Sequence, residues 1–354
     1  MTHRKYKARL LEGKRVLVTG GTGSLGKALT KRLLSCELGR PGRITIFSRD
    51  EAKQHYMRLE YLQRRVATDD VIYHNFKELL VFRIGDIRDF HSVASALRET
   101  DVVFHAAALK QVPTCEYFPT EAVRTNVLGA ENITRAIQEF QLPVETVIGV
   151  STDKACKPVN VMGMTKAIQE RVLLQANMQC PATRFICVRY GNVISSRGSV
   201  VPLFVEQIRK GGPVTITRPD MTRFLLTLDH GVDTLFSALD GARPGELYVP
   251  KVRSARVIDV ARVLIGNRKV RIVFTGIRPG EKVHEILISE EESSRTLSRG
   301  DYYVIQSILP DLRAQSNRGI ALSKEFSSAD SLMSPSQLEK LLESTEQSGE
   351  QEAS

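Results

Sequence analysis

Cysteine is scarce in this sequence, and long apolar runs are missing. The five cysteines (Cys36, Cys115, Cys156, Cys180 and Cys187) are odd in number and show no CxxC spacing. This pattern fits a reduced, cytoplasmic compartment and does not fit a zinc site, so no metal is expected. No run approaches the roughly 18 apolar residues of a membrane span. The basic N-terminus has no apolar stretch after it, so no signal peptide is predicted either.

Acidic residues are outnumbered, and the formal net charge is +10. Basic residues gather in segment 3–9, whereas the far C-terminus is acidic. We interpret the excess as a solvated surface with sites for anionic ligands; attraction of the N-terminal arm to a membrane surface is the lesser alternative. No basic stripe interleaved with aromatic residues follows the arm, so nucleic-acid binding is not expected.

Apolar segments alternate with helical patterns over the first half of the chain. Strands are predicted at 15–19, 44–47, 79–83, 102–105, 147–151 and 185–188. Helices are predicted at 51–65, 120–139 and 162–176, and another helix follows the glycine-rich segment 20–26 and ends near residue 35. This rhythm predicts an α/β fold with a doubly wound parallel sheet, an extended Rossmann fold, and a smaller C-terminal substrate-binding region. The expected divisions are a basic arm at 1–13, a cofactor-binding domain at 14–190, a substrate-binding region at 191–343 and a disordered acidic tail at 344–354. A strand near 246–250 should return to the main sheet.

A glycine-rich segment follows the first predicted strand and opens a helix. Glycines in this setting permit a tight turn and close backbone approach to a pyrophosphate, which then faces the helix N-terminus. The alternative is a glycine-rich turn without a ligand. The residues predicted to bind a dinucleotide here are Gly20, Thr22, Gly23, Ser24, Leu25 and Gly26.

The second strand ends in Ser48 and Arg49, and Lys53 lies one turn further on. A cation at this strand end favours NADP over NAD, because it can bind the 2′-phosphate. Asp50, a carboxylate at the same strand end, leaves NAD as the alternative cofactor. The alternative interpretation of Arg49 and Lys53 is that they lie in solvent at the start of a helix and bind no ligand. After the third strand, Asp86 and Ile87 are expected to border the adenine, although Asp86 also fits a helix cap.

The fifth strand ends in Ser151-Thr152-Asp153-Lys154, with Met162 and Lys166 opening the next helix. Ligands of open α/β sheets bind at the carboxyl ends of the strands. A hydroxyl, a carboxylate and an ammonium therefore meet where redox or acid–base chemistry is expected; the plain alternative is a surface turn. Met162 is unusual, because its thioether neither gives nor takes a proton.

Several longer motifs resemble one enzyme family, the UDP-N-acetylglucosamine 4,6-dehydratases of bacterial polysaccharide biosynthesis, within the extended short-chain dehydrogenases/reductases. The segments that carry the resemblance are residues 19–26, 48–50, 105–113, 151–155, 189–193, 196–200 and 278–282. The likeness runs from about residue 14 to about residue 342. It implies a UDP-sugar substrate and a tightly bound NADP that is recycled in each turnover.

The family reaction oxidises sugar C4, removes a proton from C5, expels the C6 hydroxyl as water and returns hydride to C6. By resemblance Lys154 is the C5 base, Asp153 the C6 acid, and Lys166 the ligand of the nicotinamide ribose. We expect burial near Lys166 or near the positive ring of the cofactor to lower the pKa of Lys154, and an apolar or anionic neighbourhood to keep Asp153 protonated. Met162 stands where the family usually has a catalytic tyrosine. Either activity is lost or Thr152 takes the 4-hydroxyl proton and relays it to Asp153 or solvent.

Other roles follow from the same resemblance. Ala106 and Ala107 should line the cofactor, and Lys110 the cofactor or the sugar. His105 is read as a packed strand residue. The residues expected to bind the UDP-sugar are Lys110, Asn192, Arg223, Arg278 and Glu281.

The Met-bearing branch of the family generally keeps the C5 configuration, so retention is expected, together with a homo-oligomer. The alternatives are a nucleotide-sugar 4-epimerase or reductase on the same fold, and a non-catalytic NADP-binding protein.

Overall fold

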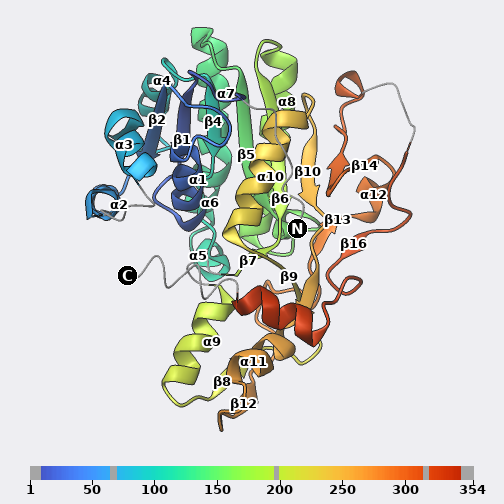
Figure 1. The fold of residues 1–354 in the computed structure, drawn as a ribbon. Coiled ribbons are helices and arrows are strands. Elements are labelled where there is room, and N and C mark those ends of the chain that lie inside the picture. The colour runs from blue at the N-terminus through green and yellow to red at the C-terminus, as the bar shows by residue number, and fades with distance from the viewer. Residues whose placement is uncertain (1–8, 64–69, 195–198, 314–318, 344–354) are drawn as a thin grey trace.

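A mostly parallel sheet organises the chain (Figure 1). The computed structural model describes residues 9–63, 70–194, 199–313 and 319–343. Most of the expected basic arm, the expected acidic tail and motif residues 196–198 lie outside this part of the chain. Within it, the main sheet has nine strands. Their order is β14 (Thr296–Arg299), β15 (Tyr302–Ile305), β10 (Leu247–Pro250), β6 (Arg184–Tyr190), β5 (Thr146–Thr152), β4 (Val102–His105), β1 (Arg15–Thr19), β2 (Arg43–Ser48) and β3 (Leu80–Ile84).

Seven strands of this sheet, β10, β6, β5, β4, β1, β2 and β3, are parallel to one another. Strand β15 pairs antiparallel with β10, and β14 pairs antiparallel with β15. The predicted doubly wound parallel sheet is therefore confirmed. Strand order reverses beside β1, whose neighbours are β2 on one side and β4 on the other. A reversal of this kind leaves a crevice at the carboxyl ends of the two strands.

Helices cover both faces of the sheet because its strands are apolar on both sides. In β1, Val16 and Val18 pack in one core and Leu17 packs in the other. The first core includes residues of α1 (Ser24–Leu34), α3 (Asp70–Leu79) and α10 (Leu228–Gly241). The second includes residues of α4 (Phe90–Leu97), α7 (Gly129–Phe140) and α8 (Val161–Gln179). Helix α2 (Glu51–Gln63) follows β2.

A smaller lobe lies beyond the carboxyl ends of the strands, at the bottom of Figure 1. It contains α9 (Val200–Arg209), β8 (Val214–Ile216), α11 (Val257–Ile265) and β12 (Ile272–Phe274). Phe204, Val214 and Leu264 belong to its separate apolar core. The remaining short elements are α5 (Val112–Tyr117), α6 (Pro119–Ala122), η3 (Asp153–Ala155), β7 (Asn192–Val193), β9 (Thr222–Leu226), β11 (Ser254–Arg256), β13 (Ile286–Ile288), α12 (Glu290–Ser293), η4 (Pro310–Leu312) and β16 (Phe326–Ser327).

The structure differs from the sequence prediction at three places. The helix expected at 120–139 is divided into α6, a π-helical turn (η2, Val123–Leu128) and α7. Asn126 explains why the π turn is held, since its amide side chain bonds both backbone groups of Leu109 and the Thr165 hydroxyl. Helix α3 was not predicted, and β10 is joined in the sheet by β14 and β15 from the far C-terminal part.

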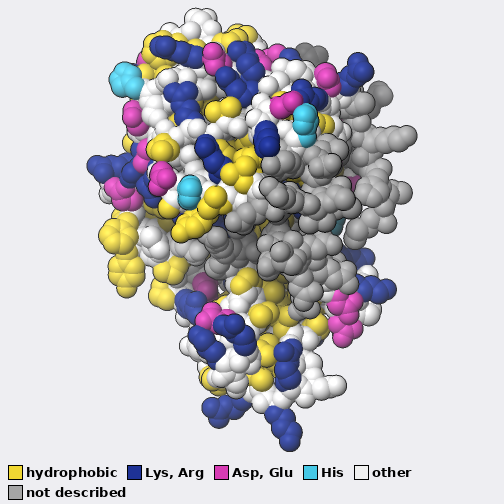
Figure 2. Space-filling model, turned by 60° about the vertical axis from the view of Figure 1, so that its left-hand side comes forward, with side chains coloured by type: hydrophobic (Ala, Val, Ile, Leu, Met, Phe, Trp, Pro, Cys, Tyr) yellow, Lys and Arg dark blue, Asp and Glu magenta, His cyan; other side chains and the backbone are white. Residues whose placement is uncertain are grey.

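Charged side chains of both signs are spread over the face shown in Figure 2, interspersed with apolar ones. Lys and Arg side chains occur on the upper part and on the lower lobe of this face. In the described part of the chain, no helix combines the length and the apolar character needed to cross a bilayer.

Gly26 is predicted to be required for packing of α1 on the glycine turn. A Cβ at Gly26 would lie 2.5 Å from the Gly21 Cα, and backbone atoms cannot turn aside. We expect Gly26→Ala to lower the free energy of unfolding by about 1–3 kcal/mol in a denaturant titration. Gly231→Ala is the matched control, because its Cβ would meet only side-chain atoms, the nearest at 3.5 Å. Equal stability of the two variants would contradict the packing argument.

Candidate active site

One cavity of about 840 Å³ runs along the carboxyl ends of the parallel strands and toward the smaller lobe. It brings together every residue that the sequence assigned to a site. From the cofactor set it is lined by Gly20, Thr22, Gly23, Ser24, Leu25, Gly26, Ser48, Arg49, Lys53, Asp86, Ile87, Ala106, Ala107, Lys110 and Lys166. From the catalytic and substrate sets it is lined by Thr152, Asp153, Lys154, Met162, Asn192, Arg223, Arg278 and Glu281.

The glycine turn after β1 has the shape that a dinucleotide pyrophosphate requires. Gly20 has φ +68°, and a Cβ there would lie 2.7 Å from the Ala107 nitrogen. The backbones after β1 and β4 therefore touch at the point where strand order reverses. At the N-terminus of α1, the cap residue Gly23 offers no side chain, and the first turn contains no acidic residue. The N–H groups of a first helical turn and the helix dipole favour an anion at such a position.

The end of β2 is polar but not strongly cationic. The Ser48 and Thr22 hydroxyls are hydrogen-bonded at 3.0 Å. The Lys53 ammonium lies 2.6 Å from Asp50, and the Arg49 guanidinium lies 3.8 Å from Asp86. Each cation thus has a carboxylate partner, so the positive charge facing a 2′-phosphate is partly offset.

Asp86 makes its main contacts with Arg88, whose Nε and Nη2 donate to its carboxylate at 2.6–3.0 Å. Burial acts to raise the pKa of Asp86, but these bonds and the charge of Arg88 outweigh it and lower the pKa. The carboxylate is therefore ionised beside Ile87, where the adenine was expected.

Three successive residues at the end of β5 form a hydrogen-bonded cluster. The Thr152 hydroxyl donates to Asp153 Oδ1 at 3.0 Å, and the Lys154 ammonium donates to the same oxygen at 2.9 Å. Asp153 is completely buried, and its Oδ2 has no hydrogen-bond partner among the described residues. Gly191, the residue after β6, lies next to this oxygen, because a Cβ at Gly191 would be 3.3 Å from Asp153 Oδ2.

Glu285, which the sequence reasoning missed, completes the cluster. Its Oε1 lies 3.3 Å from the Lys154 nitrogen and 3.9 Å from the Arg223 Nε. It follows the motif at 278–282 by three residues and directly precedes the apolar strand β13. Its place between a motif and an apolar strand was the one sign in the sequence that Glu285 could belong to the site. Periodicity gave no further sign, because it does not show whether a carboxylate in a loop is buried.

Burial and charge shift the pKa values of Asp153, Lys154 and Glu285, and not all in the same direction. Burial and the negative charge of Glu285 raise the pKa of Asp153, even though Lys154 opposes this. Burial acts to raise the pKa of Glu285, but Lys154, Arg223 and Lys282 lower it overall. Of the two carboxyl groups, Asp153 is therefore the one that holds a proton more readily, which is the direction expected for an acid in an anionic neighbourhood.

The expected lowering of the Lys154 pKa is wrong. Burial does act in that direction, but the charges of Asp153 and Glu285 outweigh it, so the pKa of Lys154 is raised. Lys166 is not a partner of Lys154. Its ammonium donates instead to the Val150 carbonyl and to Gln169, both at 2.5 Å. Burial lowers the pKa of Lys166 to about 8.

Met162 is buried beside Cys115 and Ala122 while also lining the cavity. His105 is fully buried, with its Nδ1 bonded to the Thr19 hydroxyl at 2.8 Å, and burial lowers its pKa to about 3. It is a neutral packed residue, as expected.

The residues expected to hold the UDP-sugar lie toward the smaller lobe. Asn192 and Glu281 line the cavity, and Asn192 Oδ1 and Glu281 Oε2 are buried without a hydrogen-bond partner among the described residues. Arg278 is exposed at the mouth. Arg223 donates to the Thr222 and Val283 carbonyls and faces Glu285, so its guanidinium is largely engaged within the protein.

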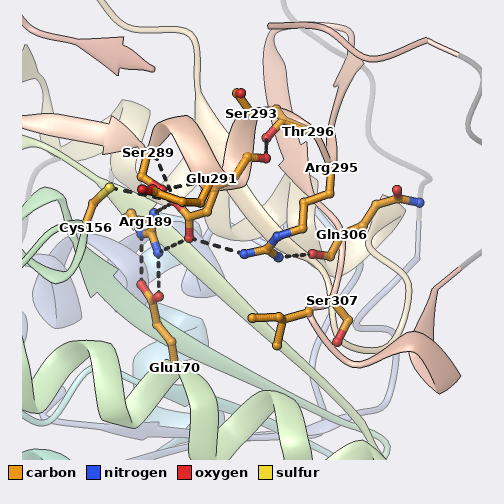
Figure 3. Close-up of polar contacts among 12 residues, drawn as sticks. Cys156, Glu170, Arg189, Ser289, Glu291, Ser293, Arg295, Thr296, Gln306 and Ser307 are labelled. Atoms are coloured by element: carbon orange, nitrogen blue, oxygen red, sulfur yellow. Dashed lines mark hydrogen bonds and ion pairs between the residues drawn. The ribbon is translucent and has the colours of Figure 1, made fainter. Parts of the chain in front are cut away.

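A buried ion network supports the end of β5 from below (Figure 3). Arg189 of β6 pairs with Glu170 of α8 at 2.6 Å and with Glu292 of α12 at 2.8 Å. It also donates to the Leu287 carbonyl of β13, and Glu170 accepts a bond from the Ser151 hydroxyl. Neighbouring strands and helices are thereby held in one arrangement around the cluster.

A dinucleotide turn joined to an acid–base cluster in one cavity defines the class: nucleotide-sugar-modifying enzymes with the extended short-chain dehydrogenase/reductase fold. The model of the polysaccharide biosynthesis protein family matches residues 16–307, and the chain belongs to this family.

Curated relatives include the UDP-glucose 4-epimerases of Rickettsia bellii, 41% identical over 89% of this chain and 91% of that protein, and of Rickettsia typhi, 42% identical over the same shares. Among solved structures, Pen from Bacillus thuringiensis is 32% identical with a TM-score of 0.82, over 94% of this chain and 99% of that one. The dTDP-glucose 4,6-dehydratase DesIV from Streptomyces venezuelae, solved with NAD and TYD bound, shares the fold. Its TM-score is 0.62 at 21% identity, over 76% of this chain and 86% of that one.

The lowered pKa of Lys166 predicts how the free energy of unfolding depends on pH. Its pKa is about 8 in the folded chain against 10.5 for the ordinary side chain. Between these values the unfolded chain binds more protons, so the Lys166 contribution to stability rises with pH. Lys166→Met should therefore lose this rise when unfolding free energies of both proteins are compared across the window.

Lys157→Met is the control for this measurement, because Lys157 is exposed in an ion pair with Glu325 and its pKa is raised, not lowered. If wild type and Lys166→Met showed the same slope with pH, the neutral, buried state of Lys166 would be wrong.

Proposed function

We propose that the chain is a UDP-N-acetylglucosamine 4,6-dehydratase. The observation that carries the proposal is the buried pair of Asp153 and Lys154, a carboxyl group and an amine 2.9 Å apart in the wall of the cavity. Elimination across C5 and C6 needs one group to remove a proton and a neighbouring group to supply one. A 4-epimerase has no need of both groups beside the ketone.

The glycine turn fits a nicotinamide dinucleotide, and we propose NADP, with Ser48, Arg49 and Lys53 around the 2′-phosphate. Lys166 would hold the nicotinamide ribose, and Asp86 and Ile87 would border the adenine. When bound, the cofactor supplies a hydride acceptor for sugar C4 and returns the hydride to C6. NAD, which is bound in the DesIV structure, is the alternative.

The residues of this chain handle the protons. Thr152 takes the 4-hydroxyl proton and passes it to solvent, or to Asp153 when this carboxylate, to which Thr152 is already hydrogen-bonded, is ionised. Lys154, in its neutral form, removes the C5 proton and later returns a proton to that carbon. Asp153 gives its proton to the C6 hydroxyl, which leaves as water. The proton that leaves the 4-hydroxyl replaces the one that Asp153 gives, so the sugar loses one water and the site keeps its proton count.

Arg278, Asn192 and Glu281 are proposed to bind the UDP part, with Arg278 at the diphosphate and Glu281 at the uridine ribose. A guanidinium suits a diphosphate because it donates bidentately. Lys110 is proposed to contact the cofactor or the sugar. Retention at C5 is proposed for the product, and the C5 proton coupling in its NMR spectrum tests this.

A nucleotide-sugar 4-epimerase is the second candidate, because the curated relatives at 41–42% identity are named UDP-glucose 4-epimerase. An epimerase oxidises C4 and then returns the hydride to C4. Met162, which stands in place of a proton acceptor, argues against this reaction, although Thr152 is available to both reactions. A cofactor-binding protein without activity is the third reading.

One incubation separates the three readings. Purified protein with UDP-N-acetylglucosamine in deuterated water should give a product lighter by one water, with deuterium at C5. An epimerase would give a product of unchanged mass without solvent deuterium, and a non-catalytic protein would bind the cofactor and leave the sugar unchanged.

Lys154→Ala should abolish both water loss and deuterium incorporation, since Lys154 is the amine that is hydrogen-bonded to Asp153. Lys157→Ala is its control, because this exposed lysine pairs with Glu325 away from the cavity and should leave turnover unchanged. Dehydration by Lys154→Ala at near the wild-type rate would refute the assignment of the base.

A homo-oligomer is also proposed. Apolar side chains on η2 and α8 are exposed in the single chain, among them Leu128, Met164 and Ile168 at 47–49%. These two elements pack side by side, so their exposed residues form one surface that a second copy can cover. Sedimentation velocity should show a species larger than 39.5 kDa, and Ile168→Asp should shift it toward the monomer.

A further inference from the structure

Glu285 is a buried carboxylate with no role in the proton steps given above. Its side chain is 3% exposed, and its Oε2 has no hydrogen-bond partner among the described residues. Its backbone is fixed on both sides by Ser328, whose hydroxyl accepts from the Glu285 N–H at 2.9 Å and whose N–H donates to the Glu285 carbonyl at 2.8 Å. A buried, incompletely bonded carboxylate is costly unless its charge is used by its neighbours.

Lys154 is shared between two carboxylates that come from opposite halves of the chain. Asp153 Oδ1 lies 2.9 Å from its nitrogen and Glu285 Oε1 lies 3.3 Å from it. Two carboxylates at one lysine compete for a proton, because like charges that are close together in a buried site cannot both ionise without cost. The remaining neighbours decide which of the two carries it.

Those neighbours favour an ionised Glu285. Arg223 from β9 lies 3.9 Å from its Oε1, and Lys282 from the preceding loop adds positive charge nearby. His284 is turned to the Thr222 hydroxyl. The Cys156 thiol beside Lys282 is neutral, because burial raises its pKa to about 12. In the part of the chain that the structure describes, Asp153 has only Lys154 as a cationic hydrogen-bond partner.

We propose that Glu285 is a positioning residue of the catalytic pair: its carboxylate holds the amine of Lys154, and its negative charge keeps a proton on Asp153. In this role it acts through Lys154 and Asp153. The inference rests on the proposed dehydratase function, in which Asp153 must be protonated before the C6 hydroxyl can leave.

The main test is the pH profile of Glu285→Gln, which keeps the shape of the side chain and removes its charge. Loss of a nearby anion lowers the pKa of both Asp153 and Lys154. The two limbs of the profile report the titrations of this carboxyl and this amine. Both limbs of kcat for water loss should therefore move to lower pH, by about 1 pH unit or more. A merely structural role would lower kcat without moving the limbs.

Two further variants sharpen the kinetic test. Glu285→Asp keeps the charge, so its profile should stay at the wild-type pH with a reduced kcat. Glu325→Gln removes an exposed carboxylate that pairs with Lys157, and its profile should match that of wild type. Unshifted limbs in Glu285→Gln would overturn the inference while leaving the dehydratase proposal intact.

A spectroscopic measurement tests the inference without turnover. Wild-type protein at neutral pH should show an infrared band of a protonated carboxyl that is absent in Asp153→Asn. In Glu285→Gln this carboxyl should ionise at lower pH than in wild type. Ionisation at the same pH in both proteins, or no such band in wild type, would overturn the inference. Absence of water loss by an otherwise folded wild-type protein would instead refute the function.

Discussion

The buried guanidinium of Arg189 is the contact on which the geometry of the site depends. It bonds carboxylates from α8 and α12 and the Leu287 carbonyl of β13, while Glu170 also holds Ser151 at the end of β5. Asp153 and Lys154 follow Ser151 by two and three residues, and Glu285 precedes Leu287 by two. One network therefore sets the distance between the carboxylates that share Lys154.

Such a network is better understood as a device for position than as a source of stability. Bringing an arginine and two glutamates out of water costs several kcal/mol per ion, and their attraction recovers this only with complete hydrogen bonding. Arg189 meets that condition, since Nε, Nη1 and Nη2 all donate. Removing one partner would leave a buried charge unpaired, which is why alternative arrangements of these elements are disfavoured.

The site combines two regions with different physical requirements. At the cofactor end the backbone itself makes the surface, through Gly20 against Ala107 and through the uncapped start of α1. At the sugar end, buried side-chain charges make it, and the pKa values of Asp153, Lys154 and Lys166 are moved by burial and by neighbouring charges in directions that no single residue dictates. Met162 adds an apolar side chain to the same cavity, and in the proposed reaction Thr152 handles the proton that a catalytic residue at this position would otherwise take.

Local pattern was enough to determine the parallel sheet and the glycine turn, because strand ends and helix starts meet at one edge of such a sheet. The resemblance to the dehydratase family, and not the pattern, pointed to Asn192, Arg223, Arg278 and Glu281, which line the same cavity. It also determined that a thioether stands at a position where a proton acceptor is usual. Tertiary structure alone decided the protonation of the cluster. Lys154 was expected to lose its proton because Lys166 was taken as its neighbour, whereas the fold places Glu285 there, 131 residues further along the chain. Spacing in the sequence carries no information about such a contact, since it is made by packing β13 and its preceding loop against the end of β5.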